Sequence, residues 1–109
     1  MANAYKVLGQ TGDASANNVT LYTCPSSTET VVSTIVVANR EASSNTFRIA
    51  VRPDGATLAN EHYLAYDSTV NANDTVTLTL GITIDATDII SVGASDANVS
   101  FSVFGTEIT

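Results

Sequence analysis

The stretch FRIAVRPDG, residues 47–55, combines a strand pattern with the turn that ends it. Phe47, Ile49 and Val51 alternate with polar or small residues, and side chains at positions i, i+2 and i+4 of a strand point to one face of its sheet. The Pro-Asp-Gly that follows has the residue types that favour a tight turn. The stretch therefore predicts a strand with one core face and one polar face, followed by a reversal of the chain.

The same pattern recurs on both sides of this stretch. Runs rich in Val, Ile, Thr, Tyr and Phe alternate with clusters of Asn, Asp, Ser, Gly and Pro, as expected for short strands joined by turns. No segment sustains a helical period. Strands are predicted at residues 5–8, 19–24, 30–38, 46–52, 62–66, 75–80, 89–93 and 99–104.

One predicted strand is apolar on both faces. VVSTIVVAN, residues 31–39, would place Val31, Ile35 and Val37 on one side of a regular strand and further apolar residues on the other. Strands of this kind are usually covered on both faces. We therefore expect this strand either to lie centrally or to meet another subunit with its outer face.

The number and spacing of the strands predict the fold class. Eight strands whose connections are too short for crossover helices favour two antiparallel sheets packed face to face. The expected fold is all-β: one small antiparallel β-sandwich domain over residues 1–109, either jelly-roll-like or immunoglobulin-like. Periodicity alone does not distinguish these two topologies.

Charge and hydropathy narrow the classes of partner. Eleven acidic and four basic residues give a net charge of −7, which repels the phosphate backbone and argues against nucleic-acid binding. The apolar runs are far shorter than the roughly 20 residues of a membrane helix, so membrane insertion is not expected. The N-terminal MANAYK lacks the features of a signal peptide, and the single Cys24 excludes an intrachain disulfide.

Residues with catalytic or metal-binding potential are few. His62 would need a nucleophile and a carboxylate held beside it, and no nucleophile motif is present. The acidic residues are spread along the turns without the spacing of a calcium loop, and no His or Cys pairs suggest zinc. Asp85 and Asp88 are expected to flank a turn. We therefore predict no enzyme activity, no catalytic, cofactor-binding or metal site, and no cofactor.

The four tyrosines leave one binding role open. Tyr5, Tyr22, Tyr63 and Tyr66 could form a shelf for a sugar, because aromatic faces pack against pyranose rings. Such tyrosines more commonly lie at sheet edges or interfaces.

Six segments carry a resemblance to a known family: YKVLGQ (5–10), LYTCP (21–25), STIVVANR (33–40), FRIAVRPDG (47–55), LTLGITIDATDII (78–90) and FSVFGTEIT (101–109). Together they resemble small virion structural proteins of tailed phages, particularly phages of cyanobacteria. Where that family usually has LYTVP, Cys24 precedes Pro25, which is a conservative change.

The resemblance implies a multi-copy subunit of the tail, neck or fibre apparatus, or a capsid decoration (cement) protein. Such a subunit would be made in the host cytoplasm, located in the virion, and assembled with itself as a trimer or ring and with other virion proteins. The alternative is a module of a phage tail that binds a glycan on the host surface.

Candidate interface residues were chosen for apolar or basic character on strands. Arg48 and Arg52 share the polar face of their strand and are expected either to pair with exposed carboxylates or to meet an acidic neighbour. The candidates are Tyr5, Val7, Leu8, Val31, Ile35, Val37, Arg48, Arg52, Phe101, Phe104 and Ile108.

Overall fold

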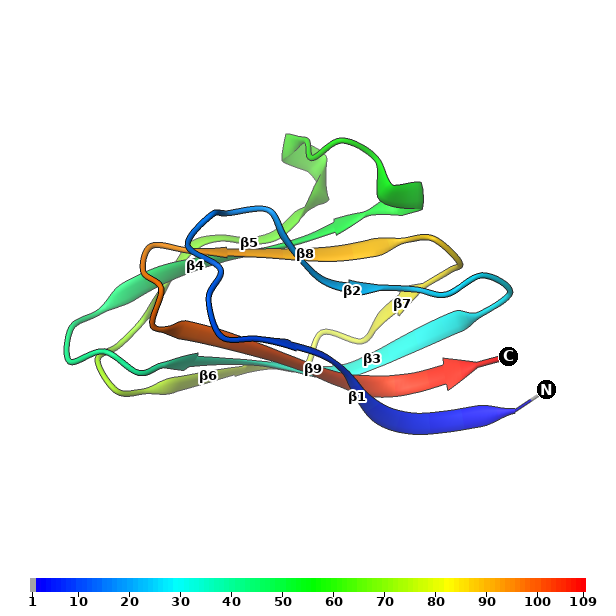
Figure 1. Ribbon diagram of the computed structural model, residues 1–109, viewed down its shortest axis with the longest axis horizontal. Coiled ribbons are helices and arrows are strands. Elements are labelled where there is room, and N and C mark those ends of the chain that lie inside the picture. Colours follow the sequence, from blue (N-terminus) through cyan, green and yellow to red (C-terminus); the bar gives the residue numbers. More distant parts are fainter. Residues whose placement is uncertain (1) are drawn as a thin grey trace.

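The computed structural model describes residues 2–109 as two antiparallel sheets packed face to face (Figure 1). The first sheet has the order β1 (Asn3–Thr11), β9 (Val99–Ile108), β3 (Glu29–Asn39) and β6 (Thr75–Leu78), with β7 (Ile82–Ile84) also paired to β3. The second sheet has the order β2 (Val19–Thr23), β8 (Ile89–Ala94), β4 (Asn45–Arg52) and β5 (Tyr63–Val70). Two 3-10 turns, Pro53–Gly55 and Asn60–His62, connect β4 to β5. The predicted all-β sandwich is confirmed.

Strand pairing in the sandwich is nested. β1 pairs with β9, β2 with β8, β3 with β6 and β7, and β4 with β5, all antiparallel. This arrangement is that of one long hairpin that is rolled up. Its successive strand pairs then lie alternately in the two sheets. It is the strand order of a jelly roll, so the structure selects one of the two topologies that the sequence left open.

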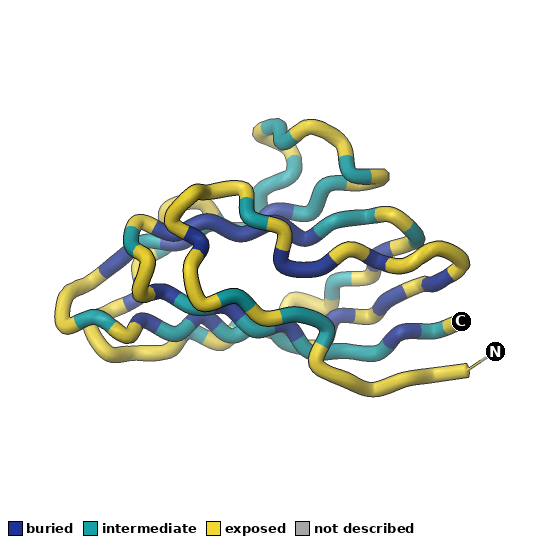
Figure 2. The backbone as a smooth tube through the Cα atoms, in the orientation of Figure 1, coloured by how far each residue is buried: buried dark blue, intermediate teal, exposed yellow. Residues whose placement is uncertain are grey.

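The core lies between the sheets and is mainly aliphatic. The regular alternation predicted for β4 and β9 places Phe47 and Phe101 inside, where their rings meet edge to face at 6.4 Å between centroids. Figure 2 shows buried positions along the strands of both sheets and mostly exposed positions in the loops. Within residues 2–109 no helix is long and apolar enough to cross a membrane.

Two β-bulges and a break in strand pairing lie next to one another across the first sheet. β1 has an extra residue at Leu8 and β3 has one at Ser33, and both bulges face Phe104 of β9. On the other side of β3, the chain between β6 and β7 leaves the ladder, and Gly81 takes a left-handed conformation there with φ 66°. β7 and the break were not predicted, and Leu80, at the end of the strand predicted for residues 75–80, is 49% exposed.

The bulge at Ser33 reverses which residues of β3 face the core. Thr30 and Val32 are buried before it, and Ile35 and Val37 are buried after it. An extra residue shifts a strand by one position and so exchanges its two faces. The expectation that Val31 shares a face with Ile35 and Val37 is therefore wrong.

Candidate interaction surfaces

The outer face of the first sheet carries almost no charge. The five strands of this sheet contain three charged residues, Lys6, Glu29 and Glu107. Lys6 and Glu107 pair with each other on the inner side, Nζ to Oε1 2.6 Å, and Glu29 lies at the first position of β3. The register assigns the remaining outward residues to what we call the uncharged face: Asn3, Tyr5, Val7, Gln10, Val31, Thr34, Val36, Ala38, Thr75, Thr77, Thr83, Ser100, Ser102, Phe104, Thr106 and Ile108.

Several large apolar side chains on the uncharged face are open to solvent. Tyr5 is 80% exposed, Val7 51% and Val31 40%. Val7 lies directly opposite Phe104 in the ladder, while Tyr5 and Val31 flank Thr106 on the neighbouring rung. These residues therefore form a continuous apolar area at the end of the sheet where both chain termini lie (Figure 1).

Three predicted interface residues belong to the core instead. Ile35 and Val37 are fully buried and Phe101 is 1% exposed. For Ile35 and Val37 the reason is the bulge at Ser33, which turns their side chains inward. Phe101 belongs to the set of alternating β9 residues whose side chains face the core. The side chains of these three residues are therefore buried in the core and do not line a contact surface.

The other predicted interface residues are divided between the two sheets. Tyr5, Val7, Val31, Phe104 and Ile108 are all on the uncharged face. Leu8 is half-buried and packs against the core from the bulge of β1. The two arginines are on the second sheet, away from this group.

Arg52 stabilises the turn that follows β4. Its Nε donates to the Ser91 hydroxyl at 2.9 Å, and its Nη1 donates to the carbonyls of Gly55 and Ala56 at 3.3 and 3.0 Å. The guanidinium of Arg52 therefore bonds to a hydroxyl and two carbonyls of its own chain. The expected pairing of Arg52 with a carboxylate is not found among residues 2–109.

Arg48 is surrounded by residues that a bulge in β5 brings to it. Phe47 pairs with Ser68 and Ile49 with Ala65, so Tyr66 and Asp67 together lie opposite Arg48. Arg48 Nε and Nη2 donate to the two carboxylate oxygens of Asp67 at 2.7 and 3.2 Å. Its guanidinium also lies over the Tyr66 ring, 4.1 Å from the centroid. Cross-strand pairing with a carboxylate is confirmed for Arg48.

The four tyrosines do not form one shelf. Tyr63 and Tyr66 meet edge to face with centroids 4.8 Å apart, beside Arg48. Tyr5 lies on the other sheet, and Tyr22 is buried between the sheets. Only the pair on the second sheet fits the predicted shelf.

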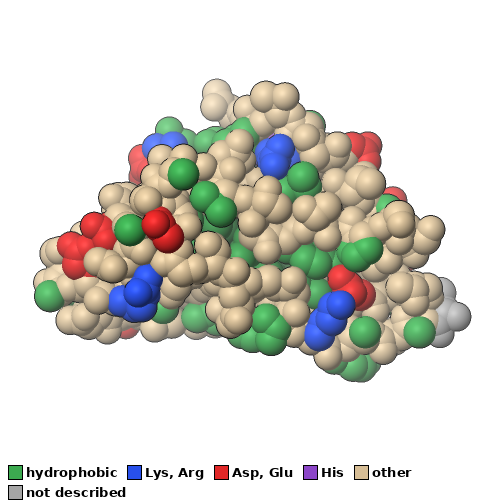
Figure 3. All heavy atoms as spheres, in the orientation of Figure 1, with side chains coloured by type: hydrophobic (Ala, Val, Ile, Leu, Met, Phe, Trp, Pro, Cys, Tyr) green, Lys and Arg blue, Asp and Glu red, His purple; other side chains and the backbone are tan. Residues whose placement is uncertain are grey.

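Surface hollows follow the outer face of the second sheet around Arg48. One of about 260 Å³ is lined by Asn17, Arg48 and Asp67, and another of about 270 Å³ by Asn60, Tyr63 and Tyr66. A narrow crevice lined by Asn17, Arg48 and Tyr63 shares residues with both hollows. We call this feature, defined by Asn17, Arg48, Asn60, Tyr63, Tyr66 and Asp67, the Arg48 groove. In the view of Figure 3, basic side chains are scattered singly and form no continuous positive patch.

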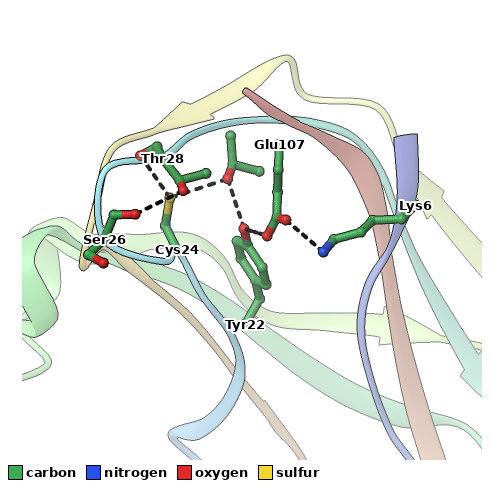
Figure 4. Close-up of polar contacts among 7 residues, drawn as sticks. Lys6, Tyr22, Cys24, Ser26, Thr28 and Glu107 are labelled. Atoms are coloured by element: carbon green, nitrogen blue, oxygen red, sulfur yellow. Dashed lines mark hydrogen bonds and ion pairs between the residues drawn. The ribbon is translucent and has the colours of Figure 1, made fainter. Parts of the chain in front are cut away.

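A buried polar network joins the sheets near the chain termini (Figure 4). The Tyr22 hydroxyl donates to Glu107 Oε2 at 2.6 Å and lies 2.8 Å from Thr30 Oγ1. Burial and the neighbouring carboxylate raise the pKa of Tyr22, so its hydroxyl remains a donor. Lys6 and the Tyr22 hydroxyl hold the pKa of Glu107 below its usual value. The network fixes three strands of the first sheet to β2, and spacing in the sequence does not reveal it.

The residues considered for catalysis have structural contacts. The Cys24 thiol is buried and bonds to the Thr28 carbonyl and the Thr30 hydroxyl at 3.3 and 3.2 Å. His62 Nδ1 accepts a hydrogen bond from the Ala59 amide at 3.0 Å. Asp88 accepts from the Asp54 and Asp85 amides, as expected of a turn residue. Among residues 2–109, no three His, Cys, Asp or Glu side chains gather closely enough to hold a metal.

Comparison with known proteins finds a likeness in structure but no match in sequence. No family model matches the sequence, and no curated protein matches it. A chain from the structure of infectious bursal disease virus, Gx strain, is similar at a TM-score of 0.42 and 14% identity, over 97% of the present chain. The present chain spans 31% of the length of that one. A likeness of this size carries no conclusion about function.

Proposed function

We propose that this protein is a non-enzymatic structural subunit of a virus particle, present in many copies and assembled through the uncharged face. The observation that carries the proposal is the apolar area formed by Tyr5, Val7, Val31, Phe104 and Ile108 on a sheet face that carries almost no charge. Solvent-exposed sheet faces are normally polar, and an exposed apolar area of this kind is typical of an interaction site.

Electrostatics favour this face for contact between copies. The chain carries a net charge of −7, so two copies repel each other through most of their surfaces. The uncharged face avoids this cost, because the one carboxylate of Glu29 lies at its margin. A second copy of the chain is therefore a better occupant of this face than a basic or acidic ligand.

The size of the face suits a stable contact. The sheets extend along the 45 and 19 Å dimensions of the molecule (Figure 1). The product of these dimensions, roughly 850 Å², is an upper limit for the projected area of one face and is of the same order as the roughly 800 Å² that each partner buries in a standard interface. β1 is also an edge strand, whose free backbone groups can pair with a neighbouring chain.

Our proposal for the position within the particle is supported by the sequence resemblance and not by the geometry. The resemblance to small virion proteins of tailed phages supports the tail, neck or fibre apparatus, or a decoration on the head. A trimer or another closed ring would cover the apolar face in every copy.

The test is the mass of the purified chain in solution, measured by light scattering coupled to size exclusion over a concentration series. We expect discrete oligomers for the unmodified chain and dissociation for both Val31→Asp and Val31→Lys. Using both signs of charge separates loss of the apolar contact from a change in net charge. Leu64→Asp is the matched control, because Leu64 is 47% exposed on β5 of the other sheet and should leave the oligomer intact.

Two outcomes would contradict the proposal. One is a monomer at the highest concentration the protein reaches. The other is an oligomer that Val31→Asp and Val31→Lys leave unchanged, which would place the contact elsewhere.

A further inference from the structure

The Arg48 groove has the chemistry of a ligand site that assembly through the opposite sheet does not use. Its two hollows measure about 260 and 270 Å³, and a narrow crevice of about 10 Å³ shares lining residues with each, so the surface open to a ligand consists of the two hollows. Aromatic rings line one end, at Tyr63 and Tyr66, and polar side chains line the other, at Asn17 and Asp67. Ligand sites commonly combine an apolar surface with a few polar groups in set positions.

The residues of the groove are held in place before any ligand binds. A bulge places Tyr66 and Asp67 on the side of Arg48, and Asp67 adopts φ 51° to do so. Asn17 also has a positive φ, 57°, and rests against Gly93, where a Cβ would lie 2.4 Å from Asn17 Oδ1. The Ala94 amide bonds to the Ala14 carbonyl, which secures the loop that carries Asn17. Backbone irregularities of this kind concentrate at functional sites.

The charge of the groove indicates a neutral ligand. Asp67 holds Arg48 with two hydrogen bonds, so the guanidinium charge is compensated. Each partner also favours the charged form of the other: the pKa of Arg48 is raised and that of Asp67 is lowered. An anionic ligand would meet a neutral pair on a chain of net charge −7. Phosphorylated or acidic molecules are therefore disfavoured.

We propose that the Arg48 groove binds a neutral carbohydrate, with pyranose rings packed against Tyr63 and Tyr66 and hydroxyls bonded to Asn17, Asn60 and the Arg48–Asp67 pair. A pyranose presents a face of C–H groups and a rim of hydroxyls. The groove offers aromatic surface for the first, and for the second it offers amides, a guanidinium and a carboxylate, which together both donate and accept. Tyr66 remains 57% exposed although Arg48 covers part of its ring, so it is open to contact.

The experiment has two stages and uses the full chain. An array of neutral and sialylated glycans identifies the best neutral oligosaccharide, which is then titrated into the labelled protein while amide NMR spectra are recorded. We expect saturable shifts at Asn17, Arg48, Tyr63 and Tyr66. Tyr66→Ala should weaken binding about tenfold, through loss of the aromatic contact.

Tyr5→Ala is the matched control, because Tyr5 is an exposed tyrosine on the opposite sheet and its loss should leave the affinity unchanged. A retained amide spectrum in Tyr66→Ala shows that the variant is folded. The mapping on the unmodified chain tests the site without any substitution. The proposal is overturned by an array without a neutral glycan signal, by binding to sialylated glycans alone, or by shifts that lie outside the groove. None of these outcomes depends on whether the chain forms oligomers.

Discussion

The hydroxyl of Tyr22 should stabilise the fold chiefly through the charge on Glu107. This hydroxyl donates to Glu107 Oε2 at 2.6 Å and lies 2.8 Å from Thr30 Oγ1, in a residue that is 7% exposed. Tyr22→Phe removes the hydroxyl and leaves the ring in place. A hydrogen bond to a charged group is worth about 1.5–3 kcal/mol, so we expect the free energy of unfolding to fall by about 2–3 kcal/mol at pH 7.

The size of this loss should depend on pH. Lys6 and Tyr22 lower the pKa of Glu107 in the folded chain below its unfolded value. A carboxyl group of this kind contributes stability that is complete above its unfolded pKa, about 4.3, and is lost as the pH falls through the folded pKa. The difference between Tyr22→Phe and the unmodified chain should therefore narrow in acid. Urea unfolding at pH 7 and at a series of acidic pH values measures it.

Glu107→Gln provides a second measure of the same coupling at constant pH. In that background the Tyr22 hydroxyl meets a neutral amide, so Tyr22→Phe should cost only about 1 kcal/mol. Other carboxyls with lowered pKa values, Asp13, Asp67 and Asp96, affect both members of each comparison equally. Equal losses in the two backgrounds, or no loss at pH 7, would refute the reasoning.

Three further substitutions test the packing, each by urea unfolding at pH 7. Gly93→Ala places a Cβ 2.4 Å from Asn17 Oδ1 and should cost about 1–3 kcal/mol; a neutral result would mean that the loop is free to move away. Phe101→Ala empties the centre of the core beside Phe47 and should cost about 3–5 kcal/mol, and a loss below 1 kcal/mol would contradict that position. Asn39→Ala removes an amide whose Nδ2 donates to three carbonyls across two loops and should cost about 3 kcal/mol, with an unchanged midpoint as the contrary result.

Local pattern was sufficient to predict most of the strands, and several residues that it proposed for contact are exposed on the sheet surface. The alternation at Phe47, Ile49 and the residues around Phe101 survives in the structure because β4 and β9 are regular where these residues lie. Tyr5 and Val7 were predicted to be apolar residues on a solvent-facing side of their strand, and both are exposed. In these segments the strands are regular over the residues concerned, so alternation along the chain predicts the face of each side chain.

The alternation of apolar residues gave the wrong faces where a bulge, set by pairing with other strands, changes which residues of a strand face the core. Nothing within residues 31–39 indicates the extra residue at Ser33, which occurs opposite Phe104 together with the bulge of β1 at Leu8. The Arg48 groove has the same origin, because the bulge of β5 brings Tyr66 and Asp67 to Arg48 from 18 and 19 positions away. A positive φ at Asp67 is one local consequence, and Asp is a residue type that tolerates it.

The sequence by itself determined that this chain forms short amphipathic strands around a thin aliphatic core, because alternation and turn residues are local properties. Only the tertiary structure decided the jelly-roll order, the faces of β3 and the partners of Arg48 and Glu107. Strands of similar composition compete for the same neighbours, and pairing such as that of β1 with β9 joins segments from opposite ends of the chain. The packing of all strands together decides which strands pair. The pairing in turn decides where both proposed surfaces lie.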